Sequence, residues 1–274
     1  MRLLIYLLVL TVIFSCGNVK TPIKAEQENA AEGESAQLQS IQASLEYLES
    51  DELEGRETGT IGIEKAAVFI ENFFSKNKIK PYFKTYRDTF RVKDVVGYNI
   101  VGYIEGNDVN LKNEFVVLGA HYDHIGAAKK VDGDSIANGA NDDASGTVAV
   151  MEWAKYFSES KSNKRSILFT LYAAEEMGLK GSEHLARTLK ESDLDLYTMI
   201  NFEMIGVPRI GDKTMAYLTG YNLTNMCEKL NSYAHEDILG FLAQAKSYNL
   251  FQRSDNYPFY QEFKIPAQAI STFD

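Results

Sequence analysis

Apolar residues recur at intervals of three and four in several segments of the chain, which is the spacing of an amphipathic helix. The first segment is 38–48 and the second is 67–74. Similar periods return at 148–157 and 182–189. The pattern therefore predicts a helix over each of these segments, with one face against a core.

Other segments have the patterns of strands. The side chains of residues 86–92 alternate as in an edge strand with one solvated face, with arginine or threonine at every second position. Four later runs, at 115–120, 167–173, 199–202 and 267–270, are almost continuously apolar, as expected of strands buried on both faces. Because these strands alternate with helices, we expect an α/β fold with three α/β/α layers and a mixed, largely parallel central sheet.

The N-terminal residues predict export from the cytoplasm. Arg2 precedes a short apolar run, residues 3–14, which is followed by Ser15 and Cys16. A charged start, a short apolar run and a small residue before the cleavage position are features of a signal peptide. Because this order resembles a bacterial lipobox, we expect residues 1–15 to be a lipoprotein signal peptide and Cys16 to be lipidated. A simple cleaved signal is the alternative.

This interpretation also divides the chain. It places the mature protein in a bacterial cell envelope, where a lipid anchor is its only attachment to the membrane. Residues 16–38 are rich in Lys, Ala, Gln, Glu and Ser, and we expect them to form a flexible tether. Residues 39–274 then form one folded domain.

Charge and cysteine content exclude several classes of function. The 274 residues include 28 Lys and Arg against 38 Asp and Glu, which gives a formal net charge of −10. Such a surface repels phosphate backbones, so nucleic acid is not an expected partner. Because Cys16 and Cys227 are the only cysteines, there is neither a disulfide framework nor a four-cysteine zinc site. We expect Cys227 to be a small core residue.

Four short motifs gather residues that bind metals or transfer protons. They are GAHYDH at 119–124, GANDDASG at 139–146, AAEEMG at 173–178 and NFEM at 201–204. Three follow the carboxyl end of an apolar run and one begins a helix, so an open α/β sheet brings them to one edge. Imidazole with several carboxylates suits a divalent metal such as zinc, and extra carboxylates allow a second ion. Each motif alone has an ordinary explanation, such as a helix cap or a solvated turn, but together they predict a metal site.

In order and spacing, these motifs resemble those of the di-zinc aminopeptidases among the zinc-dependent exopeptidases. LESDELEGRETGT at 48–60 and RSDNYPF at 253–259 are similar to flanking motifs of that family. The resemblance covers roughly residues 40–274 and implies that 39–274 is a zinc exopeptidase catalytic domain with two Zn²⁺ ions. Glu203 stands where many relatives have aspartate. The implied ligands are His121, Asp142 and Glu203 for one ion, and Asp142 and Glu176 for the other.

The same resemblance implies roles for further residues. Glu175 is similar to the general base of the family, and Asp123 to the carboxylate that orients the His121 imidazole. The peptide bond between Asp142 and Asp143 is expected to be cis, as in relatives. The residues expected on the substrate side are Ser254, Asp255, Tyr257 and Phe259.

The sequence departs from the family at one zinc ligand. Relatives have a histidine beyond the last strand, whereas this sequence ends at Asp274 and holds only four histidines. We therefore interpret it as a member shortened at the C-terminus, whose second zinc binds more weakly. His124 is interpreted as an exposed loop residue rather than a ligand, and both His184 and His235 as residues of solvated helix faces.

The implied reaction is release of N-terminal residues from peptides. A water between two metals is the nucleophile, and Glu175 is its base. A glutaminyl cyclase, which shares the fold but uses one zinc, is an alternative, as is a relative that binds peptide or protein without turnover. Carboxypeptidase specificity, side-chain preference, oligomeric state and the use of Mn²⁺ or Co²⁺ in place of zinc stay open.

Overall fold

The computed structural model describes residues 22–273, with side chains from residue 33 onward. The predicted signal peptide and the predicted lipidation site, Cys16, lie outside the described residues. The described chain falls into two units, the first ending at Ser40 and the second beginning at Ile41. This boundary lies within two residues of the predicted domain start.

None of the described helices combines the length and the apolar content needed to cross a membrane.

The first helix, α1, runs from Pro22 to Leu48. The prediction of a flexible tether over residues 16–38 is therefore wrong for its described part. Residues 22–38, which we expected to be flexible, are helical. The physical reason is that the Ala, Glu and Gln of this segment are strong helix formers, although they also suit a solvated linker. The predicted apolar face is confirmed in the second unit, where Leu45 and Leu48 pack in the core, whereas Leu38 is 59% exposed.

A nine-stranded mixed sheet forms the centre of the second unit, in the order β1-β3-β7-β4-β8-β11-β9-β10, with β2 paired to β3. Its inner strands β7, β4, β8 and β11 are mutually parallel. The predicted fold class and all four predicted buried strands are confirmed. The strand bounds are β1 Lys80–Pro81, β2 Arg87–Val92, β3 Val95–Ile104, β4 Phe115–His121, β7 Ser166–Tyr172, β8 Leu196–Glu203, β9 Ala216–Leu218, β10 Leu239–Gly240 and β11 Ala267–Ser271, with a separate hairpin of β5 Ala127–Val131 and β6 Asp134–Ile136.

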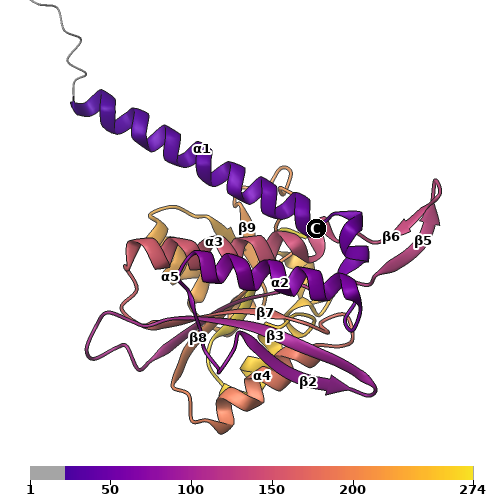
Figure 1. Ribbon diagram of the computed structural model, residues 1–274. Helices are drawn as coiled ribbons and strands as arrows, with labels where there is room; N and C mark the ends of the chain where they lie inside the picture. Colours follow the sequence, from indigo (N-terminus) through magenta and orange to yellow (C-terminus); the bar gives the residue numbers. More distant parts are fainter. Residues whose placement is uncertain (1–21, 274) are drawn as a thin grey trace, which may run out of the picture. The chain divides into compact units, whose positions relative to one another are not determined.

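Helices cover both faces of this sheet. Figure 1 shows α2 and α3 on one face and α4 on the other, and α6 packs in the same core as α4. The predicted helical segments are all found within these elements. The helix bounds are α2 Ile61–Lys76, α3 Ser145–Ser160, α4 Lys180–Glu191, α5 Met226–Ala234 and α6 Asn256–Phe263, and the short turns are η1 Asp51–Arg56, η2 Ala140–Ala144, η3 Tyr221–Leu223, η4 Ala243–Ala245 and η5 Leu250–Gln252.

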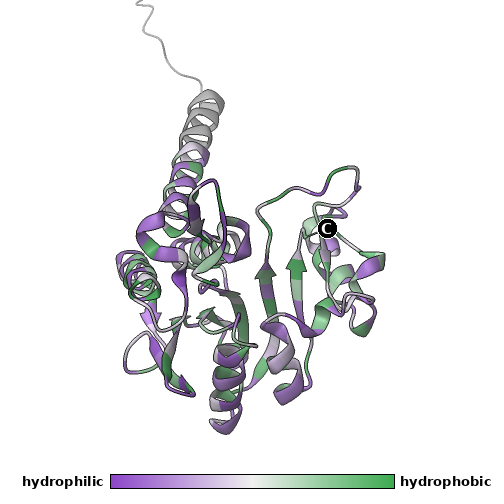
Figure 2. Ribbon diagram, turned by 90° about the vertical axis from the view of Figure 1, so that its right-hand side faces the viewer, coloured by the Kyte–Doolittle hydropathy of each residue, from purple (hydrophilic) through white to green (hydrophobic). Residues whose placement is uncertain are grey.

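The inner strands are apolar on both faces because each face meets a helical layer. In β4, Leu118 belongs to the core beneath α2 and α3, whereas its neighbour Val117 belongs to the core beneath α4 and α6. In β7 the same alternation separates Phe169 from Leu168. Figure 2 shows long hydrophobic stretches along the strands. Successive side chains therefore point to opposite faces, but both faces need apolar residues. For this reason the sequence of these strands shows a continuous apolar run and no alternation of apolar and polar residues.

Strand β2 pairs only with β3 and is the edge strand that the sequence predicted. Its residue Asp88 is nevertheless buried. The Nε2 of His184 lies 3.1 Å from an Asp88 carboxylate oxygen, and the His184 ring stacks on Phe90 at 5.5 Å. The His184 side chain is 37% exposed on α4, as predicted for a solvated helix face, and it also contacts this buried carboxylate. Cys227 is a buried core residue, as predicted.

Candidate metal centre

The parallel pairing of three strands brings the predicted site residues to one edge of the sheet. Strand β4 lies between β7 and β8, and its last residue, His121, pairs with Tyr172 at the end of β7. The loop after β7 carries Glu175 and Glu176, and Glu203 is the last residue of β8. The turn η2, which precedes α3, contributes Asp142. Carboxyl ends of parallel strands are where ligand sites collect in open α/β sheets.

The first ligand group consists of His121, Asp142 and Glu203. The Nε2 of His121 lies 3.1 Å from Asp142 Oδ1 and 3.4 Å from Glu203 Oε1. Within the described chain, this buried nitrogen makes no hydrogen bond. The Nδ1 of the same ring lies 3.1 Å from the backbone oxygen of Asp123, which can only accept, so Nδ1 carries the proton. The Nε2 of His121 therefore faces two carboxylates and is free to bind either a proton or a metal ion.

That arrangement fits a cation. A lone pair and two carboxylates repel one another unless a positive charge lies between them, and they are typical zinc ligands. Burial lowers the pKa of His121, but the charges of Glu203 and Glu175 raise it more, so that it lies well above its ordinary value. The first group thus attracts positive charge, whether a proton or a metal ion.

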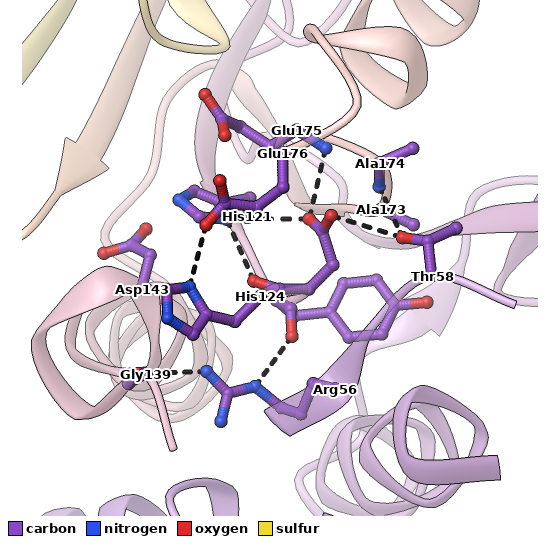
Figure 3. Close-up of polar contacts among 12 residues, drawn as sticks. Arg56, Thr58, His121, His124, Gly139, Asp143, Ala173, Ala174, Glu175 and Glu176 are labelled. Carbon is purple, nitrogen blue, oxygen red and sulfur yellow. Dashed lines mark hydrogen bonds and ion pairs between the residues drawn. The ribbon is translucent and has the colours of Figure 1, made fainter. Parts of the chain in front are cut away.

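A second group consists of His124, Asp142 and Glu176, whose ligand atoms lie within 4.8 Å of one another. The His124 Nδ1 is 2.8 Å from Glu176 Oε1, a contact drawn in Figure 3. The His124 side chain is only 13% exposed. Our interpretation of His124 as an exposed loop residue is therefore wrong. Asp142 belongs to both groups, so two cation positions can share one carboxylate.

Asp123 contacts His121 at Nδ1, the ring nitrogen that does not face the other two ligands. Its Oδ1 lies 3.5 Å from His121 Nδ1 and accepts a hydrogen bond from the backbone N–H of Glu175 at 3.2 Å. Its Oδ2 accepts one from the Thr58 hydroxyl at 3.2 Å. This carboxylate therefore sets both the orientation of the imidazole and the start of the loop that bears Glu175.

The Glu175 side chain lies among the same charges. Burial raises the pKa of Glu175 to about 9, against the opposing charge of His121. In the metal-free protein this carboxyl therefore holds a proton at neutral pH, and once ionised it is a stronger base than an ordinary carboxylate. The peptide bond between Asp142 and Asp143 is cis, as expected.

A cavity of about 300 Å³ opens beside the two groups, and it tests the predicted substrate residues. Ser254 lines it and donates a hydrogen bond to Glu203 Oε2 at 2.7 Å. The other three do not line it, because α6 begins at once and turns them toward the core. Phe259 is fully buried against Tyr172, Asp255 is fully buried, and Tyr257 packs on Phe251 and Tyr260.

Several cavity-lining residues were not expected from the sequence. Arg253 was only part of a flanking motif, and the others lie in β9 or η5, in the residue after β9, at the end of β11 or after β11. They are Tyr217, Thr219, Leu250, Ser271 and Phe273.

The sequence analysis also missed Arg56, which was only part of a flanking motif. Its guanidinium is almost fully buried, and Nε donates to the backbone oxygen of Tyr122 at 2.9 Å. Nη1 and Nη2 donate to the backbone oxygens of Asn138 at 2.7 Å and Gly139 at 3.0 Å. Arg56 thus ties the loop after β4 to the segment before η2 (Figure 3). Burial lowers the pKa of Arg56 to about 10.

A centre of histidine and carboxylates at the carboxyl edge of an α/β/α sheet is the arrangement of a metal-dependent hydrolase. The comparison with known families agrees with this class. The model of peptidase family M28 matches residues 99–274, and the chain belongs to that family.

The names of individual relatives describe zinc metalloproteases and aminopeptidases. A probable zinc metalloprotease of Pyrenophora tritici-repentis is 36% identical over 115 residues, which is 42% of this chain and 26% of the relative. The crystal structure of the LapA aminopeptidase of Legionella pneumophila is similar with a TM-score of 0.65 and 25% identity, over 95% of this chain and 68% of that one. The chain spans about a quarter of the length of the curated relatives it matches.

A glutaminyl cyclase of Fimbriiglobus ruber is also similar in structure. Its TM-score is 0.63 at 18% identity, over 85% of this chain and 84% of that one. At this identity the likeness concerns the fold alone.

Proposed function

We propose that the chain is the catalytic part of an aminopeptidase that releases N-terminal residues from peptides and uses two zinc ions. The observation that carries the proposal is the pair of ligand groups that share Asp142. A carboxylate shared by two ligand groups can hold two metal ions close together, which is the arrangement of a two-metal hydrolase. The buried Nε2 of His121, which makes no hydrogen bond within the described chain, supports a cation at the first group.

Zinc bound by these groups would polarise a peptide carbonyl and acidify a water molecule. His121, Asp142 and Glu203 would hold one ion, and Asp142 with Glu176 the other. Asp123 keeps the His121 lone pair aimed at the site through its contacts with Nδ1.

Glu175 is the proposed general base. Cations at the two groups would favour its ionised form over the protonated form that burial favours. It would take the proton of the attacking water and pass it to the leaving amine. Its backbone N–H is fixed by Asp123, so the carboxylate projects from a defined loop.

Peptide substrates would enter the 300 Å³ cavity beside these residues. Its lining includes the carboxylates of Glu175, Glu176 and Glu203 and the guanidinium of Arg253. Two zinc ions would balance these carboxylates, so the charge of the cavity does not choose between an aminopeptidase and a carboxypeptidase. The choice of an aminopeptidase rests on the likeness to the LapA aminopeptidase.

The test is hydrolysis of aminoacyl anilides by the zinc-loaded parent and by Glu175→Gln. We expect the variant to lose about 10²-fold or more in kcat because the base is removed. Glu236→Gln, which changes an exposed glutamate beyond α5, serves as the control. Equal inactivity of a folded, zinc-loaded parent and the variant would favour a non-catalytic binding protein, and cyclisation of N-terminal glutamine without anilide hydrolysis would favour a glutaminyl cyclase.

We also propose that Cys16 is lipidated and anchors the protein in a bacterial envelope. The proposal rests on the order of residues 2–16. In a bacterial host, labelled palmitate should enter the parent but not Cys16→Ser. Label in both proteins, or in neither, contradicts the anchor.

A further inference from the structure

We propose that His124 is a direct ligand of the metal that Asp142 and Glu176 bind, which presupposes the two-metal function proposed above. The second ion would then have three protein ligands, one each from the loop after β4, from η2 and from the loop after β7. This gives it as many protein ligands as the first group provides.

The distances permit this coordination. Two ligands of a tetrahedral zinc ion, each at about 2.1 Å from it, are roughly 3.4 Å apart. His124 Nδ1 and Glu176 Oε1 are 2.8 Å apart, and the ligand atoms of the whole group lie within 4.8 Å. Shifts of less than about 1.5 Å therefore suffice to place all three around one ion.

The ring of His124 is held in this position by its surroundings. The backbone N–H of His124 donates to the backbone oxygen of Arg56 at 3.2 Å. On the other side, Gly139 lies so close that an added Cβ would be 2.7 Å from His124 Cγ. Gly139 is itself fixed by the hydrogen bond from Arg56 Nη2. The backbone of His124 is thus anchored and its ring lies against Gly139, as expected of a ligand that is oriented before the metal binds.

Charge supports the same role. The carboxylates of Asp142 and Glu176 lie beside the His124 ring, and both are metal-ligand types. The imidazole and the two carboxylates would give the ion three protein ligands of zinc type. A positioning role, in which Nδ1–H only donates to Glu176, is the competing explanation, and the two differ in whether His124 touches the ion.

Cobalt substitution distinguishes these explanations. Co²⁺ occupies nitrogen and oxygen sites of zinc type and shifts the exchangeable imidazole N–H resonances of bound histidines. With two Co²⁺ per full chain, we expect two shifted N–H signals, one from His121 and one from His124. His124→Ala should retain only the His121 signal, which also shows that the site is folded.

Metal affinity gives a second readout. A chelator competition should show that His124→Ala binds the second zinc more than about 100-fold more weakly, beyond the range for residues that only orient a ligand. The first zinc should be unaffected. His124→Gln is the second variant, and His235→Asn, at an exposed histidine after α5, is the matched control.

The outcomes separate the two proposals. If the parent binds two Co²⁺ ions but shows a shifted N–H signal from His121 alone, and His124→Ala keeps both zinc affinities, His124 is not a ligand, while the two-metal function stands. If the parent binds one ion, or none, the two-metal function and the role of His124 both fail.

Discussion

The Thr58 hydroxyl joins two loops that carry the metal site. It donates to Asp123 Oδ2 at 3.2 Å and accepts the backbone N–H of Ala174 at 2.9 Å. Both partners are buried. One small side chain therefore couples the carboxylate that orients His121 to the residue just before Glu175.

Thr58→Val removes this coupling at nearly constant volume. The buried N–H of Ala174 loses its partner, so we expect a loss of stability of about 1–3 kcal/mol and a loss of zinc affinity of roughly 10–100-fold. Thermal unfolding and chelator competition measure both effects. Thr60→Val, which removes a hydroxyl that bonds only to the Glu57 backbone oxygen, is the control; equal effects of the two variants would argue against the coupling.

Asp255 makes stability depend on pH. Burial raises its pKa to about 7 from 3.8, against the opposing charge of His121. Between these values the native protein holds a proton that the unfolded chain has lost, so stability falls as pH rises and the cost is complete above pH 7. In metal-free protein, Asp255→Asn should raise stability by about 1–3 kcal/mol at pH 8 and by little at pH 4.

Calorimetry of the parent and Asp255→Asn at several pH values measures this difference. Asp132→Asn, in the exposed β5–β6 hairpin, should leave the profile of the parent unchanged. A constant difference between parent and Asp255→Asn from pH 4 to 8 would mean that this carboxyl does not titrate between the two states.

At the scale of elements, the contact between α2 and η1 positions the segment that bears Arg56 and Thr58. Gly62, in the first turn of α2, has the backbone of Leu53 directly against it, and an added Cβ would overlap the Leu53 carbonyl oxygen. Because the obstacle is backbone, the helix and the turn can only move apart.

Gly62→Ala should therefore destabilise the protein by about 2 kcal/mol or more, although alanine is the better helix former. Chemical unfolding provides the measurement. Gly33→Ala, the same change in α1 where no atom of the described chain lies nearby, should be neutral or stabilise by up to about 1 kcal/mol. A neutral Gly62→Ala would show that the packing yields at low cost.

The sequence predicted the strands that are buried on both faces and the helices that are buried on one face. The apolar runs of β4, β7, β8 and β11 and the spacing in α2 to α4 identified their elements because burial selects apolar residues at the period of the structure. It was silent about the hairpin β5–β6, whose side chains are nearly all exposed. Composition alone did not separate a solvated helix from a tether at residues 22–38.

At the scale of the whole molecule, the metal centre joins three strands and one helix start, so bound zinc should stabilise the entire second unit. Binding to the native state alone adds about 2.7 kcal/mol at a free zinc concentration 100 times Kd. A chelator should lower the unfolding temperature of the parent, and zinc should restore it. Zinc should have a much smaller effect on His121→Ala, and an equal effect would place the ion elsewhere.

The amino-acid sequence by itself determined the four buried strands, the core-facing helices, the family and the residue types of the metal centre, because burial patterns and the four short motifs are local properties of the chain. Only the tertiary structure decided which residues meet. It moved Phe259 into the core, because helix α6 turns that side chain away from the cavity, and it brought His124 to Glu176 across 52 positions. Contacts between loops depend on how strands pair and helices pack, and no local pattern encodes that geometry.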